Sequence, residues 1–184
     1  MCALGWLAAN AARYQVDPAR ISITGYSAGG NPAMLAAYSM GDPLLPPSCD
    51  VPAVPVKSAV NFYGPADLDL LHRSSGSRAY VQDALGRCIG GSPERHPELY
   101  RALSPLTHAG ANVPPTLTVL GTSDRIVPVE QAEALQRAID GAGGIHELYL
   151  LPATDHGFDV NWGGFGTQIA RAKVEQFLRK HGGL

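Results

Sequence analysis

Four short stretches of the chain carry the β-branched and other apolar residues that are typical of buried strands. In the first stretch, apolar and small polar side chains alternate up to Gly25, and Gly64-Pro65 and Gly121 follow the second and third stretches. Glycine and proline at such positions indicate that the chain turns where each strand ends. The predicted strands are 21–24, 56–63, 116–120 and 145–151.

Before, between and after these stretches, apolar residues recur at helical spacing. The predicted helix 128–140 places Ala132, Leu135 and Ile139 on one face and begins with proline, which suits a first helical turn. The other predicted helices are 2–14, 32–40 and 167–180. Because parallel strands need crossover connections of this length, the alternation predicts an α/β fold, with a mostly parallel sheet and helices on both faces.

The segment 65–115 departs from this alternation, because it contains no predicted strand and only short helical pieces such as 80–85. Two interpretations stay open: a small cap-like insertion over a pocket, or a plain crossover connection with extra turns. A length of 184 residues fits one domain. We therefore predict a single domain over 1–184 that includes this segment.

Composition and charge exclude several classes of protein. Apolar residues make up 45% of the chain and charged residues 16%, which excludes an intrinsically disordered protein. The formal net charge of −2 offers no basic surface for nucleic acid or anionic membranes. The sequence has no apolar run long enough to span a membrane and no signal-peptide pattern, so we expect a cytoplasmic protein. Whether Met1 is the natural start stays open.

The chain has three cysteines, Cys2, Cys49 and Cys88. They are too few and too scattered for a disulfide framework, and they lack the C-x-x-C spacing of zinc or redox sites. We therefore expect free thiols that are mostly buried.

The strongest chemical signal is the sequence GYSAGG at 25–30, a G-x-S-x-G pattern between a predicted strand and a predicted helix. A serine hydroxyl is a poor nucleophile unless a sharp turn holds it where a base can reach it, and small residues at 25 and 29 avoid clashes there. Ser27 is the predicted nucleophile, and the backbone N–H of Ala28 is predicted to donate to a developing oxyanion. The strand-turn-helix context favours this interpretation over a glycine-rich turn with an incidental serine.

A nucleophilic serine needs a base and an acid that orients the base, and in an α/β sheet both are expected on loops that follow later strands. Asp124 follows the third predicted strand, and His156 follows the fourth. We predict that these two residues act with Ser27. The five other histidines have no such placement: His72, His96, His108, His146 and His181.

Each of these residues also has a purely structural interpretation. Asp124 alone would suit a turn or cap ahead of Pro128, and His156 alone would be a surface-loop histidine. Asp67, just after the second predicted strand, is the alternative acid. We favour Asp124 because nucleophile, acid and base then have the chain order known for one class of serine hydrolases.

At these residues the chain resembles the α/β-hydrolase superfamily, and within it the bacterial esterase and lipase group related to carboxylesterases and hormone-sensitive-lipase-like enzymes. The resemblance covers nearly the whole chain and rests on GYSAGG, NFYGPADL, SPLTHAGANVPPTLTVLGTSDRIVP and DHGFD. It implies that Ser27 is the nucleophile, that His156 is the general base and then the general acid, and that Asp124 orients the imidazole. It also implies an acyl-serine intermediate.

The sequence departs from that superfamily at its amino-terminal side. Family members begin with further strands and an HGGG-like loop that supplies oxyanion N–H groups, and this sequence starts in the helix before the Ser27 strand. The resemblance therefore implies the carboxyl-terminal half of the fold, with one open edge on strand 21–24. Such an edge invites pairing, so a homodimer is a predicted partner. Each lost oxyanion donor would cost about 10² to 10³ in rate.

The function predicted first is hydrolysis of small or medium carboxylic esters, with no metal and no organic cofactor. Two alternatives stay open. One is a serine peptidase of the prolyl-oligopeptidase type, although the propeller domain of those enzymes has no counterpart here. The other is a catalytically weak or inactive fragment that acts as an interaction module through its sheet edge. The acyl and alcohol preferences depend on pocket walls that the sequence does not specify.

Overall fold

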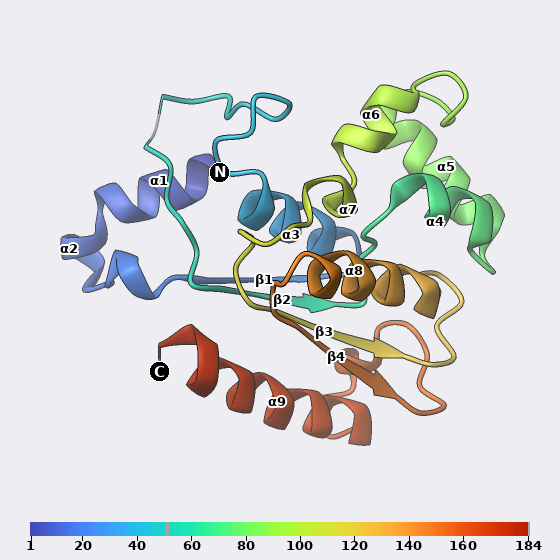
Figure 1. The fold of residues 1–184 in the computed structure, drawn as a ribbon. Helices are drawn as coiled ribbons and strands as arrows, with labels where there is room; N and C mark the ends of the chain where they lie inside the picture. The colour runs from blue at the N-terminus through green and yellow to red at the C-terminus, as the bar shows by residue number, and fades with distance from the viewer. Residues whose placement is uncertain (51, 184) are drawn as a thin grey trace.

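The computed structural model describes residues 1–50 and 52–183. Its centre is a four-stranded parallel sheet in the order β1-β2-β3-β4, so strands that are adjacent in sequence are adjacent in space (Figure 1). All four predicted strands are present, and the first extends two residues beyond its predicted end. The strands are β1 (Ser22–Tyr26), β2 (Ser58–Phe62), β3 (Thr116–Gly121) and β4 (His146–Leu151).

Helices cover both faces of the sheet. Figure 1 shows α3 (Gly30–Tyr38) and α8 (Val129–Gly141) on one face and α9 (Phe165–Phe177) on the other. This arrangement confirms the predicted α/β fold. The remaining α-helices are α1 (Cys2–Ala9), α2 (Ala11–Tyr14), α4 (Leu68–Ser74), α5 (Arg78–Ile89), α6 (Pro97–Ala102) and α7 (Pro105–His108).

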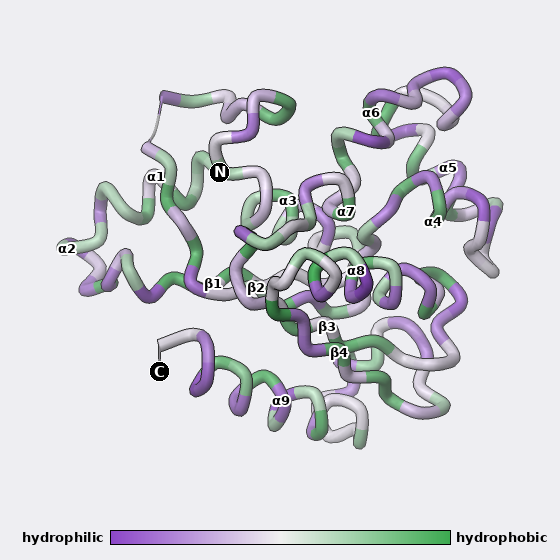
Figure 2. The backbone as a smooth tube through the Cα atoms, viewed as in Figure 1, coloured by the Kyte–Doolittle hydropathy of each residue, from purple (hydrophilic) through white to green (hydrophobic). Residues whose placement is uncertain are grey.

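The centre of the sheet is its most buried part, since every residue of β2 and β3 is buried. The largest core cluster joins these strands to α9, where Ala170 and Phe177 are buried. Hydrophobic and hydrophilic residues alternate along α9 in Figure 2, as expected for a helix with one face on the sheet. The strand β1 lies at the edge of the sheet, and its Ser22, Thr24 and Tyr26 are exposed.

The first predicted helix, 2–14, is wrong as one continuous element. The structure divides it into α1 and α2 at Asn10, whose Nδ2 atom donates to the Trp6 carbonyl at 2.8 Å. Asparagine side chains that bond to the backbone compete with the continuation of a helix. The chain leaves α2 through Gln15, which has a left-handed φ of 55°.

The segment 65–115, described throughout, contains α4 to α7 and no strand. Figure 1 shows α4, α5 and α6 as a group to one side of the sheet. The turn between α4 and α5 contacts the loop after β3, because the Ser77 N–H donates to the Arg125 carbonyl at 2.9 Å. Whether the segment is a cap, and whether 1–184 is one domain, stay predictions.

The cysteine prediction is wrong for two of the three residues. Cys2, at the start of α1, and Cys49, in the segment after α3, form a disulfide with their Cα atoms 5.9 Å apart. Cys88 on α5 is a free thiol but is exposed rather than buried. The pairing is not evident from the sequence, because 47 positions separate the two cysteines. Only the fold brings their Cα atoms close enough for a disulfide.

Candidate active site

Ser27 lies on a sharp turn between β1 and α3. Its backbone has a φ of 51°, in the left-handed region that residues other than glycine seldom adopt. A short 3-10 helix, Ser27–Gly29, follows directly and leads into α3. A strand, a strained serine and a helix in this order are the local structure expected of a nucleophile elbow, so the serine side chain is presented at the carboxyl end of β1.

Two close approaches of the backbone explain why glycine stands beside this serine. A Cβ atom on Gly25 would lie 2.1 Å from the Gly29 carbonyl oxygen, so a side chain there would push the turn open. A Cβ atom on Gly30 would lie 2.8 Å from the Cα atom of Gly64, where β2 ends. The glycines therefore let the start of α3 pack against the ends of both strands.

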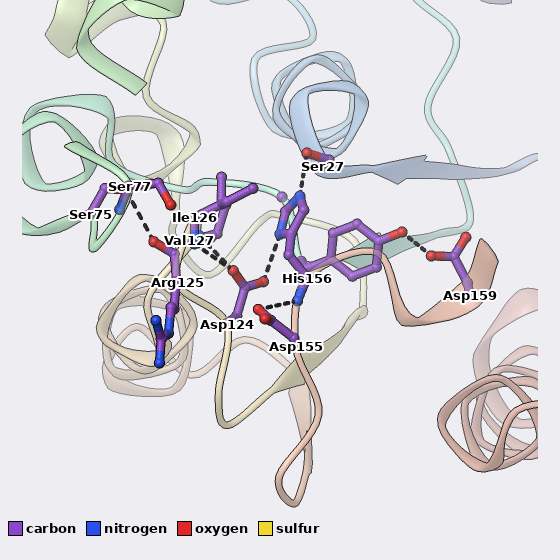
Figure 3. A network of polar contacts seen from close by, with 12 residues as sticks. Ser27, Ser75, Ser77, Asp124, Arg125, Ile126, Val127, Asp155, His156 and Asp159 are labelled. Atoms are coloured by element: carbon purple, nitrogen blue, oxygen red, sulfur yellow. Dashed lines mark hydrogen bonds and ion pairs between the residues drawn. The ribbon is translucent and has the colours of Figure 1, made fainter. Parts of the chain in front are cut away.

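The structure brings Ser27, His156 and Asp124 together in one chain of hydrogen bonds (Figure 3). The Oγ atom of Ser27 lies 2.7 Å from Nε2 of His156, and Nδ1 of His156 lies 2.7 Å from Oδ2 of Asp124. With a proton on Nδ1, the imidazole donates to the carboxylate and accepts the serine hydroxyl at Nε2. This arrangement is able to take a proton from the serine.

The carboxylate of Asp124 makes use of both oxygens. Oδ1 accepts hydrogen bonds from the N–H groups of Ile126 at 2.9 Å and Val127 at 2.8 Å, while Oδ2 contacts His156. Oδ1 therefore stabilises the turn ahead of Pro128, and Oδ2 is left to contact the imidazole. The side chain of Asp124 is 0% exposed and that of His156 is 15% exposed, so water screens their interaction weakly.

The alternative acid, Asp67, caps a helix in the structure. Asp67 lies at the amino-terminal cap of α4, where its side chain accepts hydrogen bonds from the N–H groups of Asp69 and Leu70, each at 3.0 Å. In the described part of the chain, no contact joins Asp67 to His156.

Three of the other histidines are bonded away from Ser27. His108 contacts Asp42, His146 contacts Thr118, and His181 contacts Glu147.

Ala28 comes directly after Ser27 in the short 3-10 helix, at the amino-terminal side of α3. Its backbone N–H is therefore adjacent to the serine along the chain. The assignment of this N–H as an oxyanion donor stays a prediction.

Two residues beside His156 were missed from the sequence. The Tyr63 ring contacts the imidazole with the ring centroids 4.6 Å apart, and the Tyr63 hydroxyl donates to Asp159. Burial is the main cause that raises the pKa of Tyr63 above its ordinary value, and the hydrogen bond to Asp159 adds to it, so the hydroxyl stays protonated as a donor. Both residues lie in quoted motifs, NFYGPADL and DHGFD, but no spacing signal connects them.

Within 1–50 and 52–183, no cluster of three or more His, Cys, Asp or Glu side chains is arranged to hold a metal ion. Over the same residues, no helix is long and apolar enough to cross a membrane.

Comparison with known families shows which family the chain belongs to. The family model BD-FAE matches residues 1–139. The chain belongs to the BD-FAE family. The match includes Ser27 and Asp124 and ends before His156. This agrees with the esterase and lipase resemblance inferred from the motifs.

This BD-FAE family member also resembles individual esterases. LipM of Mycobacterium tuberculosis, a probable carboxylic ester hydrolase, is 34% identical over 178 residues, which covers 96% of this chain and 41% of LipM. The thermophilic esterase Est2 of Thermogutta terrifontis, solved with propionate bound, gives a TM-score of 0.74 and 27% identity over 97% of this chain and 62% of that one. Est2 phosphorylated by paraoxon gives a TM-score of 0.73 and 27% identity over 97% of this chain and 60% of that one. The α/β-hydrolase fold is thereby confirmed, and the chain spans less than two thirds of each relative.

Proposed function

We propose that the protein is a serine hydrolase that cleaves carboxylic esters through an acyl-serine intermediate. The observation that carries the proposal is the hydrogen-bonded series Ser27, His156 and Asp124, with 2.7 Å at each contact. A hydroxyl, an imidazole and a shielded carboxylate in this geometry form the arrangement that activates serine on unrelated folds.

The first half of the reaction transfers the acyl group to the enzyme. Nε2 of His156 takes the hydroxyl proton as Oγ of Ser27 attacks the ester carbonyl carbon, and the carbonyl oxygen becomes an oxyanion. The N–H of Ala28 donates a hydrogen bond to this oxyanion. When the carbon–oxygen bond to the alcohol breaks, the imidazolium returns the proton to the leaving alcohol, and the acyl group remains on Ser27.

The second half releases the acid. Nε2 of His156 takes a proton from water as the water oxygen attacks the acyl carbon, and the proton then passes to Oγ of Ser27 when the acyl bond breaks. Asp124 keeps the Nδ1 proton in place and stabilises the positive charge that forms on the imidazole twice in each cycle. No step consumes a redox equivalent or needs an external co-reactant besides water.

The relatives support ester substrates of modest size. LipM bears the name of a carboxylic ester hydrolase, and Est2 has been solved with propionate bound and after phosphorylation by paraoxon. A short acyl group and an electrophile that reacts covalently are what an activated serine would accept. We extend this to the present chain as hydrolysis of short-chain esters.

The test is the rate of p-nitrophenol release from a short-chain p-nitrophenyl ester. Ser27→Ala is expected to lower kcat by at least about 10³-fold, because the covalent path disappears. Ser74→Ala, which changes an exposed serine on α4, is the matched control and should keep the wild-type rate. Wild-type activity no higher than that of Ser27→Ala would reject the proposal.

The same assay separates the two candidate acids. Asp124→Asn is expected to lower kcat by about 10⁴-fold, because the wrong imidazole tautomer is then favoured. Asp67→Asn should affect the α4 cap and leave kcat within a few-fold. The reverse order of effects would transfer the orienting role to Asp67.

Two further measurements decide the alternatives. Cleavage of aminoacyl p-nitroanilides but not of esters would favour the peptidase. An inactive interaction module would leave Ser27 unlabelled by a fluorophosphonate, whereas prompt labelling in wild type and none in Ser27→Ala supports the hydrolase.

We also propose that the edge of β1 pairs with a second copy of the chain. The Lys57 N–H donates to the Ile21 carbonyl on the β2 side, so by alternation the backbone groups of Thr24 point away from β2. Thr24→Lys places a charge at this edge and should convert a dimer to a monomer in sedimentation velocity, while Thr107→Lys on α7 should not. A monomeric wild type at micromolar concentrations would refute the pairing.

A further inference from the structure

Tyr63 connects the catalytic histidine to a second carboxylate. Its ring lies against the His156 imidazole with the centroids 4.6 Å apart and an interplanar angle of 61°. Its hydroxyl donates to Oδ1 of Asp159. Asp159 lies three positions beyond His156, and both are labelled in Figure 3. Tyr63 is 4% exposed, so its ring packs against the imidazole shielded from bulk solvent.

The pair joins two elements that the sequence keeps far apart. Tyr63 directly follows β2, and its backbone N–H donates to the Val119 carbonyl of β3 at 2.9 Å. Asp159 lies in a short 3-10 helix, Phe158–Val160, on the loop that carries His156. The bond between them therefore fastens the histidine loop to the centre of the sheet, and the Phe158 ring, 5.2 Å from Tyr63, packs at the same place.

The other contacts of the histidine loop run to α9, since Oγ1 of Thr167 donates to the carbonyls of Phe158 at 3.0 Å and Asn161 at 2.7 Å, whereas the Tyr63–Asp159 bond ties the loop to the sheet. Val160 is 89% exposed and Trp162 is 69% exposed. The two ring nitrogens of His156 fix the imidazole only toward Ser27 and Asp124, and those bonds allow the ring to tilt about the line that joins them. A ring packed against the imidazole and anchored through its own hydroxyl restricts that tilt.

We infer that Tyr63, anchored by Asp159, is a positioning residue that keeps Nε2 of His156 aligned with Ser27 during ester hydrolysis. This inference rests on the proposed function. The backbone of Tyr63 is consistent with this role, because its φ of 41° is a strained conformation that persists only where surrounding contacts enforce it. Tyr63 contacts the imidazole and Asp159 contacts Tyr63, so both are assigned to act through His156.

The experiment compares four single variants in the ester assay. Tyr63→Phe keeps the ring and removes the anchoring hydroxyl, and Asp159→Ala removes its acceptor. Both are expected to lower kcat by about tenfold or more at an unchanged KM, since small misplacements of a catalytic group are costly. Asp159→Asn retains an acceptor oxygen and should stay within about twofold of wild type. Tyr100→Phe is the control, because it removes a hydroxyl on α6 that donates to the Gly91 carbonyl at 3.0 Å and has no contact with His156 among the described residues.

A double variant and a readout without substrate complete the test. Tyr63→Phe combined with Asp159→Ala should lower kcat no further than either change alone, as expected of one shared interaction. Hydrogen exchange over 155–164 should be faster in both single variants and unchanged in Tyr100→Phe.

The two readouts separate the inference from the proposed function. A wild-type kcat in Tyr63→Phe, or additive losses in the double variant, would overturn the inference while leaving ester hydrolysis in place. If the chain proved inactive on esters, the exchange data would still decide whether Tyr63 and Asp159 fasten the loop, and unchanged exchange would overturn that as well.

Discussion

Two side chains at the site come from residues with left-handed backbones. Ser27 has a φ of 51° and Tyr63 a φ of 41°, and each is the first residue after its strand. Such conformations cost about 1 to 3 kcal/mol each and persist where neighbouring contacts enforce them. For Ser27 those contacts are the glycines around it, and for Tyr63 they are the bonds to Val119 and Asp159. Strain at the residue scale is thus stored where two adjacent strands end.

A different residue, His146, is expected to make the stability of the protein depend on pH. His146 on β4 is 7% exposed, its Nε2 lies 2.9 Å from Oγ1 of Thr118, and its Nδ1 is buried without a partner in the described part of the chain. Burial lowers the pKa of His146 from 6.5 to about 4, against an opposing effect of Asp140. Between these two pH values the unfolded chain binds a proton that the folded protein does not.

We therefore expect the free energy of unfolding to fall by about 3 kcal/mol as the pH drops from 6.5 to 4 because of this one group. The stabilising contribution is complete above pH 6.5 and is lost toward pH 4. Urea unfolding of wild type and His146→Leu over this range is the measurement, and the variant should show a shallower decline. An equally steep decline in both proteins would assign the acid sensitivity to other groups.

At the scale of elements, the disulfide joins α1 to the segment after α3. Cys2 is the first residue of α1, and the bridge closes a loop with a sequence separation of 47. In the chain-entropy model a loop of this length is worth about 4 kcal/mol. Disulfides persist mainly in oxidising compartments. The cytoplasmic location expected from the sequence stays a prediction.

Removing the bridge should destabilise the protein measurably. Cys2→Ser combined with Cys49→Ser is expected to lower the free energy of unfolding by about 2 to 4 kcal/mol in urea. Cys88→Ser, which replaces the exposed free thiol, is the matched control and should change it by less than about 0.5 kcal/mol. A thiol titration of the purified protein should find one free thiol, that of Cys88. Three free thiols would show that the bridge does not form.

The predicted elements follow the printed sequence closely where the pattern is local. Strand 116–120 and helix 128–140 differ from β3 and α8 by one residue at one or both ends. The prediction failed within 2–14, because the side-chain bond from Asn10 to Trp6 divides a helix whose apolar spacing is uninterrupted. Apolar spacing records which face is buried, and it carries no information about a competing hydrogen bond.

At the scale of the whole molecule, the order β1-β2-β3-β4 places one site residue after each strand. Ser27 follows β1, Tyr63 follows β2, and the loops after β3 and β4 carry Asp124 and His156. In a parallel sheet all carboxyl ends lie at the same edge, so residues separated by up to 129 positions meet within hydrogen-bonding distance. The alternation of strands and helices is what makes this convergence possible.

The sequence by itself determined the four parallel strands, the turn that presents Ser27, and the placement of Asp124 and His156 on loops after the third and fourth strands. These features are local, since strand patterns, glycine positions and chain order are all written in neighbouring residues. Only the tertiary structure decided that Asp67 caps α4, that Cys2 bonds to Cys49, and that Tyr63 lies between His156 and Asp159. Each of these depends on distances between segments remote in the chain, and such distances follow from how helices and strands pack rather than from any pattern along the sequence.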